Sequence, residues 1–458
     1  MQDLFSPSKW TATQKLTVSF LVVILTGSFL LWLPISNQPG THQTYLDHLF
    51  TAVSMVCVTG LTVLSIKDTY TVFGQIVGII LMQIGGLGLI TLISVSLFYL
   101  KRRISLKSQT TLQMALNRNT NDNYKNFLFN AYRFTFAVEA IGALVLMTDF
   151  IPRYGWAKGA FNAVFVAVSA FCNAGFDNLG SNSLQDFVLN PTVNFTVALL
   201  IIAGGIGFTV WAELSERLNH YFHSRPRLLR LSFRRLSSHS RLALIATASL
   251  LFGGALITWL SELKHGSTIG NYNIFQQWMI SFFQSAAFRT AGFSTLNYEA
   301  THPFTNLVYM ILMLIGGAPG GTAGGIKVTT AAIMFLLFRS ELKGHTEVTF
   351  HKRVIPASAV KQAMTIILFF FTVLMIGYSL LLLEHPNLNP YHLLFEAISA
   401  MATVGSSAGI TSQLTTWGRI IIMGMMFLGR VGPFTVFLSL LQLDRKEIHY
   451  ADTDVLIG

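Results

Sequence analysis

Hydrophobic residues occupy this chain in long runs, which short polar stretches separate at regular intervals. The first run, Leu16–Ile35, is uncharged and has about 20 residues, the length of a helix that crosses a bilayer. The second, Leu49–Val58, is only half as long, and the third, Val72–Leu100, is longer than one crossing requires. Together the three runs predict an outer helix, a re-entrant half-helix and an inner helix.

The same order of runs recurs three times along the chain. The later units are Phe127–Ile151, Ala160–Asn173 and Val193–Leu214; Leu242–Leu260, Phe275–Thr290 and Phe304–Phe338; and Ala357–Leu383, Leu393–Thr403 and Arg419–Leu441. The pattern predicts an all-α membrane protein with four helix–pore-helix–helix repeats around one central pore and eight transmembrane helices. The repeats span 16–100, 127–214, 242–338 and 357–441, between an N-terminal segment, 1–15, and a C-terminal tail, 442–458.

A short motif marks each half-helix. Every copy has Phe ten residues before a Gly, and Ser or Ala six residues before it. The glycines are Gly60, Gly175, Gly292 and Gly405, at successive intervals of 115, 117 and 113 residues. So even a spacing indicates an internal repeat, and it predicts that the four glycine turns occupy equivalent places in the fold.

Composition places the chain in a lipid bilayer. Apolar residues make up 52% of the chain and charged residues 11%, with a mean hydropathy of +0.55, whereas a soluble domain carries about 25% charged residues. The net charge of +11 does not indicate a nucleic-acid partner, because most Lys and Arg residues lie between the repeats and at the two ends. Basic residues gather in cytoplasmic loops in this way. Both termini are therefore expected in the cytoplasm, with the glycine turns entering the membrane from outside. The two cysteines, Cys57 and Cys172, are expected to be small buried fillers.

The four glycine turns suggest an ion pathway. Backbone that leaves helical geometry at membrane depth must be buried or line a water-filled path. A ring of such turns can replace the hydration shell of a monovalent cation with backbone carbonyls, and the partially negative C-terminal ends of the half-helices favour a cation there. A single glycine of this kind would be interpreted as a helix cap, but four in register favour a pore. The predicted filter residues are Val58, Thr59, Gly60, Asn173, Ala174, Gly175, Thr290, Ala291, Gly292, Thr403, Val404 and Gly405.

The inner helices carry a second glycine pattern. Gly85-Gly86-Leu87-Gly88 and Gly204-Gly205-Ile206-Gly207 are interpreted as sites of close helix packing. In the third repeat the corresponding segment, Gly316–Gly325, is too rich in glycine to stay helical. In the fourth, Arg430 replaces the second glycine and places a charge near the middle of the membrane. Because broken backbone has free carbonyls and Arg has five donors, the two features are expected to face each other below the filter.

The remaining charged residues have less specific interpretations. Arg289, beside the third turn, either sets the potential at the mouth or braces a helix end or a carboxylate. Glu139 and Glu396 are expected to make structural hydrogen bonds rather than to couple protons, and Lys327 either joins the glycine-rich segment or snorkels. Neither a metal cluster nor a nucleophile–base pair is supported, so the chain is not expected to be an enzyme.

These motifs resemble those of the Trk/Ktr/HKT superfamily of potassium transporters over nearly the whole chain. The resemblance rests on Val58-Thr59-Gly60-Leu61, Phe171-Cys172-Asn173-Ala174-Gly175-Phe176, Phe288-Arg289-Thr290-Ala291-Gly292-Phe293 and Ala402-Thr403-Val404-Gly405. Because the first span begins near residue 16, the membrane subunits of Ktr systems (KtrB-like) are the closer match. The resemblance implies one pore per subunit, with K⁺ bound at the filter carbonyls. It also implies a preference for potassium, because plant members that transport sodium have Ser at the first filter position, where this chain has Gly60. Ser406 departs from the pattern, which has a more apolar residue there.

The resemblance also implies a gate and partners. The gate is the glycine-rich segment, contacted by a basic residue of the last helix; its residues here are Gly316, Gly317, Ala318, Pro319, Gly320, Gly321, Thr322, Ala323, Gly324, Gly325, Lys327 and Arg430. The implied assembly is a homodimer with a cytoplasmic ring of RCK-type regulatory subunits (KtrA-like), in the cytoplasmic (inner) membrane of a bacterium. Nucleotide would bind only to that partner, no covalent cofactor is implied, and sodium stimulation stays open. The tail end, Thr453–Gly458, is predicted to dock at the dimer interface.

Two alternatives stay open. A sodium-permeable HKT-like transporter would share the architecture and differ at the filter. An alternating-access solute carrier would also contain helices broken at mid-membrane, but such carriers often consist of inverted repeats. The four repeats here are parallel and each contributes a half-helix from the outside, which favours the pore.

Overall fold

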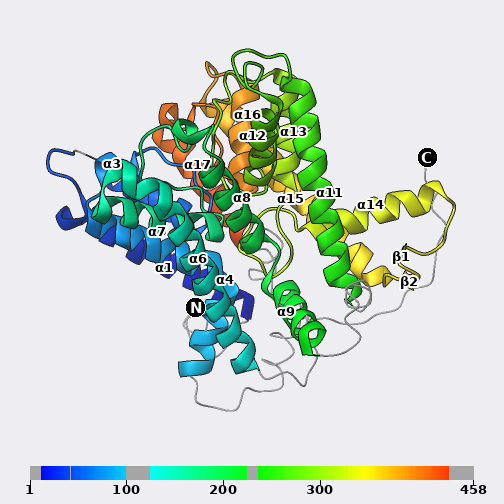
Figure 1. The fold of residues 1–458 in the computed structure, drawn as a ribbon. Helices are drawn as coiled ribbons and strands as arrows, with labels where there is room; N and C mark the ends of the chain where they lie inside the picture. The colour runs from blue at the N-terminus through cyan, green and yellow to red at the C-terminus, as the bar shows by residue number, and fades with distance from the viewer. Residues whose placement is uncertain (1–11, 42, 100–123, 224–235, 433–458) are drawn as a thin grey trace, which may run out of the picture.

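The computed structural model describes residues 12–41, 43–99, 124–223 and 236–432, and in this part the protein is a bundle of helices with one small β-hairpin (Figure 1). Four outer helices, α1 (Ala12–Trp32), α6 (Tyr124–Tyr154), α11 (Ser238–Glu262) and α15 (Ala357–Glu384), are each followed by a buried half-helix. The half-helices are α2 (Tyr45–Val56), α7 (Trp156–Cys172), α12 (Ile274–Ala287) and α16 (Pro390–Met401).

An inner segment follows each half-helix. The inner segments are α4 (Val72–Tyr99); α8 (Pro191–Gly205) with α9 (Phe208–His223); α13 (Pro303–Leu314) with α14 (Val328–Leu342); and α17 (Thr416–Val431). Short elements complete the chain: η2 (Pro34–Ser36), α3 (Ile66–Thr69), η3 (Gln185–Phe187), η4 (Thr411–Gln413) and the antiparallel strands β1 (Thr349–Phe350) and β2 (Arg353–Val354). In Figure 1, α14 extends sideways from the bundle and leads to this hairpin.

The half-helices begin where the sequence supplies caps. Thr44 and Asp47 form a capping box at the start of α2, and Asn273 and Gln276 form another at the start of α12. The Asn389 side chain caps α16, whose first residue is Pro. Along all four half-helices most side chains are buried, so these short helices form the centre of the bundle.

The predicted limits of the half-helices are wrong by a few residues at both ends. Each helix starts earlier than expected. Polar capping residues precede the apolar runs of α2, α12 and α16, and α7 begins after Gly155. Each also ends before the residue that stands two places ahead of the motif glycine. Those residues, Val58, Asn173, Thr290 and Thr403, have positive φ angles of 56°, 59°, 65° and 52°, which a right-handed helix cannot contain.

Non-helical glycines stand at matching positions of three inner segments. Gly88 bends α4 with a φ of 27° and a ψ of −99°, and Gly432 follows the end of α17 with a φ of 92°. In the second repeat α8 and α9 meet at an angle of 100° around Gly207, whose φ is 94°. The expectation of one continuous inner helix over Val193–Leu214 is therefore wrong, whereas the expected break in the third repeat is confirmed between α13 and α14.

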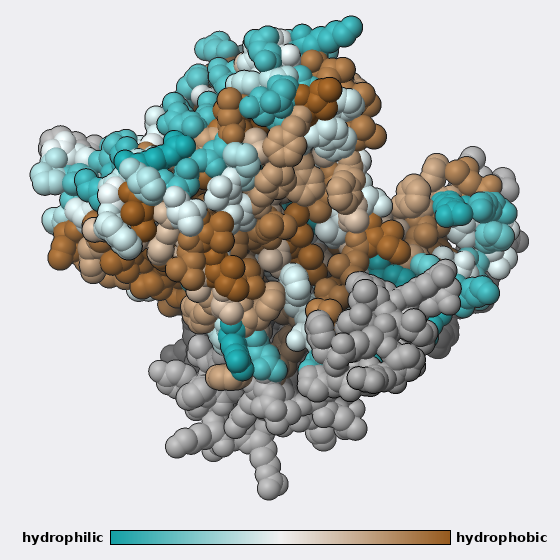
Figure 2. Space-filling view, viewed as in Figure 1, coloured by the Kyte–Doolittle hydropathy of each residue, from teal (hydrophilic) through white to brown (hydrophobic). Residues whose placement is uncertain are grey.

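Large apolar side chains are exposed on all four outer helices. Figure 2 shows a band of them across the visible face, with hydrophilic residues gathered above it. Within the described residues, α6, α11 and α15 are each long and apolar enough to cross a membrane, and the bent pair α8 and α9 adds a fourth crossing if counted as one span. These lengths fit a membrane protein, while the count of eight crossings stays a prediction.

Several sequence-based predictions fall outside the described residues. They concern the N-terminal residues 1–11, the basic loop residues within 100–123 and 224–235, the last part of the fourth inner helix after 432, and the C-terminal tail.

Candidate functional site

The four motif glycines lie at the turns that follow the half-helices. Gly60, Gly175, Gly292 and Gly405 all have positive φ, at 100°, 72°, 74° and 91°. In each turn a second left-handed residue stands two places earlier, so the same alternation of backbone conformation occurs four times. The predicted filter segments therefore share one local geometry, which glycine adopts without steric cost.

The four turns close into a ring. A Cβ added to Gly60 would lie 2.7 Å from the carbonyl oxygen of Ala174 in the second repeat, and one added to Gly175 would lie 2.7 Å from that of Ala291 in the third. One added to Gly292 would lie 2.5 Å from the oxygen of Val404, and one added to Gly405 would collide with that of Thr59. Each repeat thus contacts the next, and the fourth contacts the first. Only glycine fits this ring, because backbone oxygen atoms occupy the space of any side chain.

Serine residues of the half-helices hold three of the turns. The hydroxyls of Ser54 and Ser399 accept the N–H groups of Gly60 and Gly405 at 3.1 Å in each case. The Ser169 hydroxyl accepts from the N–H of Phe176, the residue after the motif glycine, at 2.9 Å. The third repeat has Ala286 at this position, so its turn relies on backbone bonds such as Gly292 N–H to Ala287 O at 3.3 Å. The serine of the motif is therefore a support for the turn.

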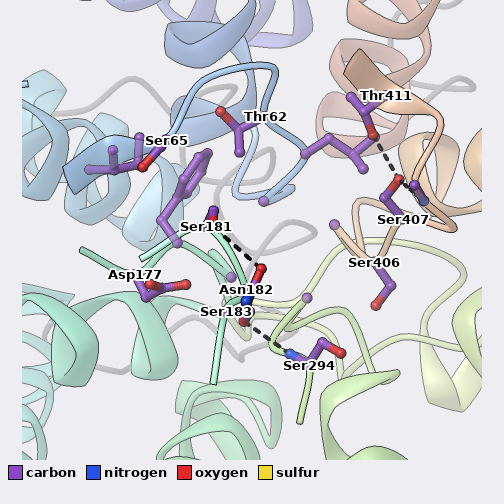
Figure 3. Close-up of a pocket in the computed structure, with 18 of the residues that line it drawn as sticks. Thr62, Ser65, Asp177, Ser181, Asn182, Ser183, Ser294, Ser406, Ser407 and Thr411 are labelled. Carbon is purple, nitrogen blue, oxygen red and sulfur yellow. Dashed lines mark hydrogen bonds between the residues drawn. The ribbon is translucent and has the colours of Figure 1, made fainter. Parts of the chain in front are cut away.

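A cavity of about 480 Å³ lies outside the ring (Figure 3). All four glycines line it, together with hydroxyl and amide side chains such as those of Thr62, Asn182, Ser294 and Ser407. A ring of carbonyls beneath such a polar opening can bind a cation that has lost part of its water. Among the described residues, no group of three or more His, Cys, Asp or Glu side chains could hold a metal ion.

Inner-segment glycines allow close packing below the ring. A Cβ at Gly85, Gly204 or Gly429 would collide with a backbone carbonyl near the end of its own half-helix, at Val56, Phe171 or Met401 respectively. These carbonyls stand at the same place in three repeats, four residues before the motif glycine. The expected close packing in the first two repeats is thereby confirmed. In the third repeat the matching glycine, Gly316, instead contacts the carbonyl of Gly324 in the glycine-rich loop.

The glycine-rich loop between α13 and α14 crosses beneath the ring toward the second repeat. Its ends are joined by a short parallel bridge between Ile315 and Ile326. Its N–H groups at Ala318 and Thr322 donate to the carbonyls of Gly205 and Gly204, at 2.8 and 3.1 Å. The break between α8 and α9 supplies these acceptors, since a continuous helix would have used both carbonyls itself.

Three basic side chains hold this loop. Arg430 donates to the carbonyl of Thr322 in the loop and, at 2.5 Å, to that of Gly85 in the first repeat. The expected contact between Arg430 and the loop is therefore confirmed. Lys327 donates to Ala323 O at 2.7 Å, which places it with the loop. Arg289 is a brace, because it donates to Gly316 O at 3.1 Å and to the Thr247 hydroxyl at 3.4 Å.

Other buried polar residues make the structural contacts that were expected. Gln83 donates to Glu139 at 3.4 Å, and Thr411 donates to Glu396. Cys57 and Cys172 are buried and free. Ser406, where the sequence comparison expected a more apolar residue, is buried.

Two contacts were missed by reasoning from the sequence. The hydroxyl of Thr322 meets the side chain of Asn173 in the second filter segment at 3.1 Å. Asp47 of α2 forms an ion pair with Arg419 of α17. The partners are separated by 149 and 372 residues, so no local pattern indicates either pair. The one available signal was that polar residues stood inside otherwise apolar runs.

Comparison with known proteins identifies relatives along nearly the whole chain. The family model TrkH, described as a cation transport protein, matches residues 5–447. Ktr system potassium uptake protein B of Vibrio alginolyticus is 37% identical over 442 residues, covering 96% of this chain and 94% of that protein. Potassium/sodium uptake protein NtpJ of Enterococcus hirae is 35% identical over 453 residues, covering 97% of both. The crystal structure of the potassium transporter TrkH from Vibrio parahaemolyticus has the same fold, with a TM-score of 0.71 at 16% identity, covering 93% of this chain and 85% of that one.

Proposed function

The chain belongs to the TrkH family of cation transport proteins, and we propose that it is the pore-forming subunit of a bacterial potassium-uptake system. The members of this family that it matches are transporters, and it is likewise a transporter and not an enzyme. In the proposal, K⁺ crosses the membrane through the ring of the four filter segments, after giving up part of its hydration shell to their carbonyls.

One observation supports this proposal most strongly. The motif glycine of each repeat packs against a backbone carbonyl of the next repeat, from the residue just before that repeat's own motif glycine, and the four contacts close into a cycle. A solute carrier has no need for four equivalent backbone turns packed this tightly, whereas a cation filter does. The arrangement goes with four helix–pore-helix–helix repeats and eight crossings, with both termini in the cytoplasm and the cavity of Figure 3 facing outside.

The second part of the proposal is that the glycine-rich loop, Gly316–Gly325, is the gate. It lies directly below the ring, and Arg430 ties it to the first repeat. A positive charge at this place adds an electrostatic barrier for K⁺ to the steric one. Its release would be driven from the cytoplasm by a regulatory ring of RCK-type subunits acting on a homodimer, and any nucleotide would bind to that ring. The name of the Vibrio alginolyticus relative, Ktr system potassium uptake protein B, supports a system with a further subunit.

A sodium-permeable transporter is the second candidate, because one relative bears the name potassium/sodium uptake protein. The test is the competition of Na⁺ with K⁺ uptake in cells that lack uptake systems of their own. Gly60→Ser should lose the preference for potassium, since the new side chain stands 2.7 Å from Ala174 O at a φ of 100°.

The matched control is Gly253→Ser on α11, where an added Cβ has no atom within 4 Å. This variant should keep the competition ratio of the parent. An unchanged ratio in Gly60→Ser and in the corresponding variants at Gly175, Gly292 and Gly405 would remove these glycines from the filter. Strong Na⁺ uptake by the parent chain would favour the second candidate.

A further inference from the structure

The gating loop packs against the filter itself. A Cβ at Gly316 would lie 3.2 Å from the methyl group of Thr290, and one at Gly324 would collide with the hydroxyl of Thr403. Thr290 and Thr403 stand two places before the filter glycines of the third and fourth repeats. Asn173 stands at the same place in the second repeat and meets Thr322 of the loop. Three of the four filter segments therefore rest on the loop.

The contact with the second segment differs in kind from the other two. The hydroxyls of Thr290 and Thr403 have no hydrogen-bond partner among the described groups. The Thr322 hydroxyl, in contrast, lies 3.1 Å from Phe171 O and 3.1 Å from the Asn173 amide. If the Asn173 amide is turned over, its nitrogen donates to the Thr322 hydroxyl at the same distance of 3.1 Å. The bond between loop and filter thus holds in either orientation of the amide.

Thr322 also divides its bonds between two parts of the molecule. Its hydroxyl and its N–H bind only second-repeat groups, the latter donating to Gly204 O at 3.1 Å. Neighbouring loop residues do the same, since Gly320 O accepts from Phe208 N–H at 3.1 Å. Its carbonyl, in contrast, accepts from Arg430 of the fourth repeat. One residue is therefore fixed to the second repeat by its side chain and tied across the pathway by its carbonyl.

We propose that Thr322 is a positioning residue of the selectivity filter. Its hydroxyl helps to set the preference between K⁺ and Na⁺, and this role is separate from the gating contact at its carbonyl. Asn173 is in a left-handed conformation directly before Ala174, whose carbonyl belongs to the ring. Anchoring the Asn173 side chain restrains the peptide between these two residues, and with it the direction of the filter carbonyls. This inference rests on the proposed function of the ring as a cation filter.

The test removes the hydroxyl and keeps the shape. The measured quantity is the inhibition constant of Na⁺ divided by the half-saturating concentration of K⁺, both for K⁺ uptake. Thr322→Val in the full-length chain should lower this ratio about two- to tenfold, the range that the loss of one hydrogen bond supports. Thr322→Ser, which retains the hydroxyl, should keep the ratio of the parent. Arg430→Gln weakens the bond to the carbonyl of Thr322 and should change the rate of uptake without changing the ratio.

A double-mutant cycle shows whether Thr322 acts through Asn173. Asn173→Gly tolerates the left-handed backbone and removes the amide. It should lower the ratio by itself, and Thr322→Val should add nothing further to it. If Thr322→Val is not recovered as folded protein, Thr322→Ala takes its place in the cycle.

The outcomes separate this inference from the proposed function. A parent chain without saturable K⁺ uptake would overturn the proposed function. A parent that prefers K⁺, together with a folded Thr322→Val that has the same preference, would overturn the role of Thr322 alone. An additive effect of Thr322→Val in the Asn173→Gly background would also overturn it, because the hydroxyl would then act elsewhere.

Discussion

At the scale of single residues, one carboxyl group stands out in the cavity next to the ring. Asp177 is the acidic side chain among the described residues that line the cavity, and Figure 3 shows it beside the second turn. Burial raises the pKa of this carboxyl to about 6, against the N–H groups of Leu179 and Gly180 and the charge of Lys67, which lower it. The group therefore carries its charge at neutral pH and loses it in mildly acidic medium.

With the cavity facing outside, as proposed above, this titration predicts that K⁺ uptake depends on external pH. As the pH falls from 7 to 5, Asp177 gains a proton, the cavity attracts cations less, and the half-saturating K⁺ concentration should rise about threefold. Asp177→Asn should show the higher value at every pH, with no step near 6. Asp186→Asn, on an exposed neighbour outside the cavity, is the control. It should keep the step and move it slightly to lower pH, because the charge of Asp186 raises the pKa of Asp177. A step that persists in Asp177→Asn would assign it to another group.

At the scale of elements, the loop and α17 are joined by Arg430. If the loop is the gate, Arg430→Gln should raise the maximal rate of K⁺ uptake and reduce its dependence on the proposed cytoplasmic partner, because the bonds to Thr322 O and Gly85 O are weakened. The half-saturating K⁺ concentration should stay close to that of the parent, since the filter is untouched. Deleting much of Gly316–Gly325 should also raise flux, but it removes Thr322 as well, so the point variant is the cleaner test.

The control for this prediction is Arg339→Gln, an exposed basic residue at the end of α14. It should leave both the rate and the partner dependence as they are. If Arg430→Gln instead abolishes uptake in a well-expressed protein, Arg430 supports the open pathway and does not hold the gate shut.

At the scale of the whole molecule, the first and the last repeat must meet to close the ring. Asp47 of α2 and Arg419 of α17 form an ion pair at this junction, and Asp47 also accepts from Thr44 N–H at 3.0 Å. Arg419→Met should lower the free energy of unfolding in detergent by about 1–2 kcal/mol, because it leaves a largely buried carboxylate without its charged partner. Thermal unfolding of the purified protein measures this loss.

A double variant tests the cause of that loss. Asp47→Asn with Arg419→Met should recover part of the stability, since the unpaired charge is gone. Arg353→Met, on the exposed strand β2, should unfold at the temperature of the parent. Equal melting temperatures for Arg419→Met and the parent would show that ring closure rests on the filter contacts and the apolar packing alone.

The local chemistry of the sequence was enough to predict the repeating elements. The apolar runs and their lengths predicted outer helices, half-helices and inner segments, and the even spacing of Gly60, Gly175, Gly292 and Gly405 predicted four equivalent turns. These properties are local, because helix length, the high cost of a glycine-rich helix and the left-handed freedom of glycine belong to short segments. The break at Gly316–Gly325 was predicted for the same reason.

Tertiary structure decided where segments end and what they touch. The sequence Gly204-Gly205-Ile206-Gly207 resembles Gly85-Gly86-Leu87-Gly88, yet the second repeat divides there into two helices at 100°, while the first has a kink at Gly88 inside α4. The carbonyls of Gly204 and Gly205, which are free because the helix breaks there, accept hydrogen bonds from the glycine-rich loop. The break is therefore stabilised by a segment more than a hundred residues away. The pairs of Thr322 with Asn173 and of Asp47 with Arg419 arise in the same way. A buried polar group must find a partner wherever packing brings one, and that place is a property of the assembled ring and not of any single repeat.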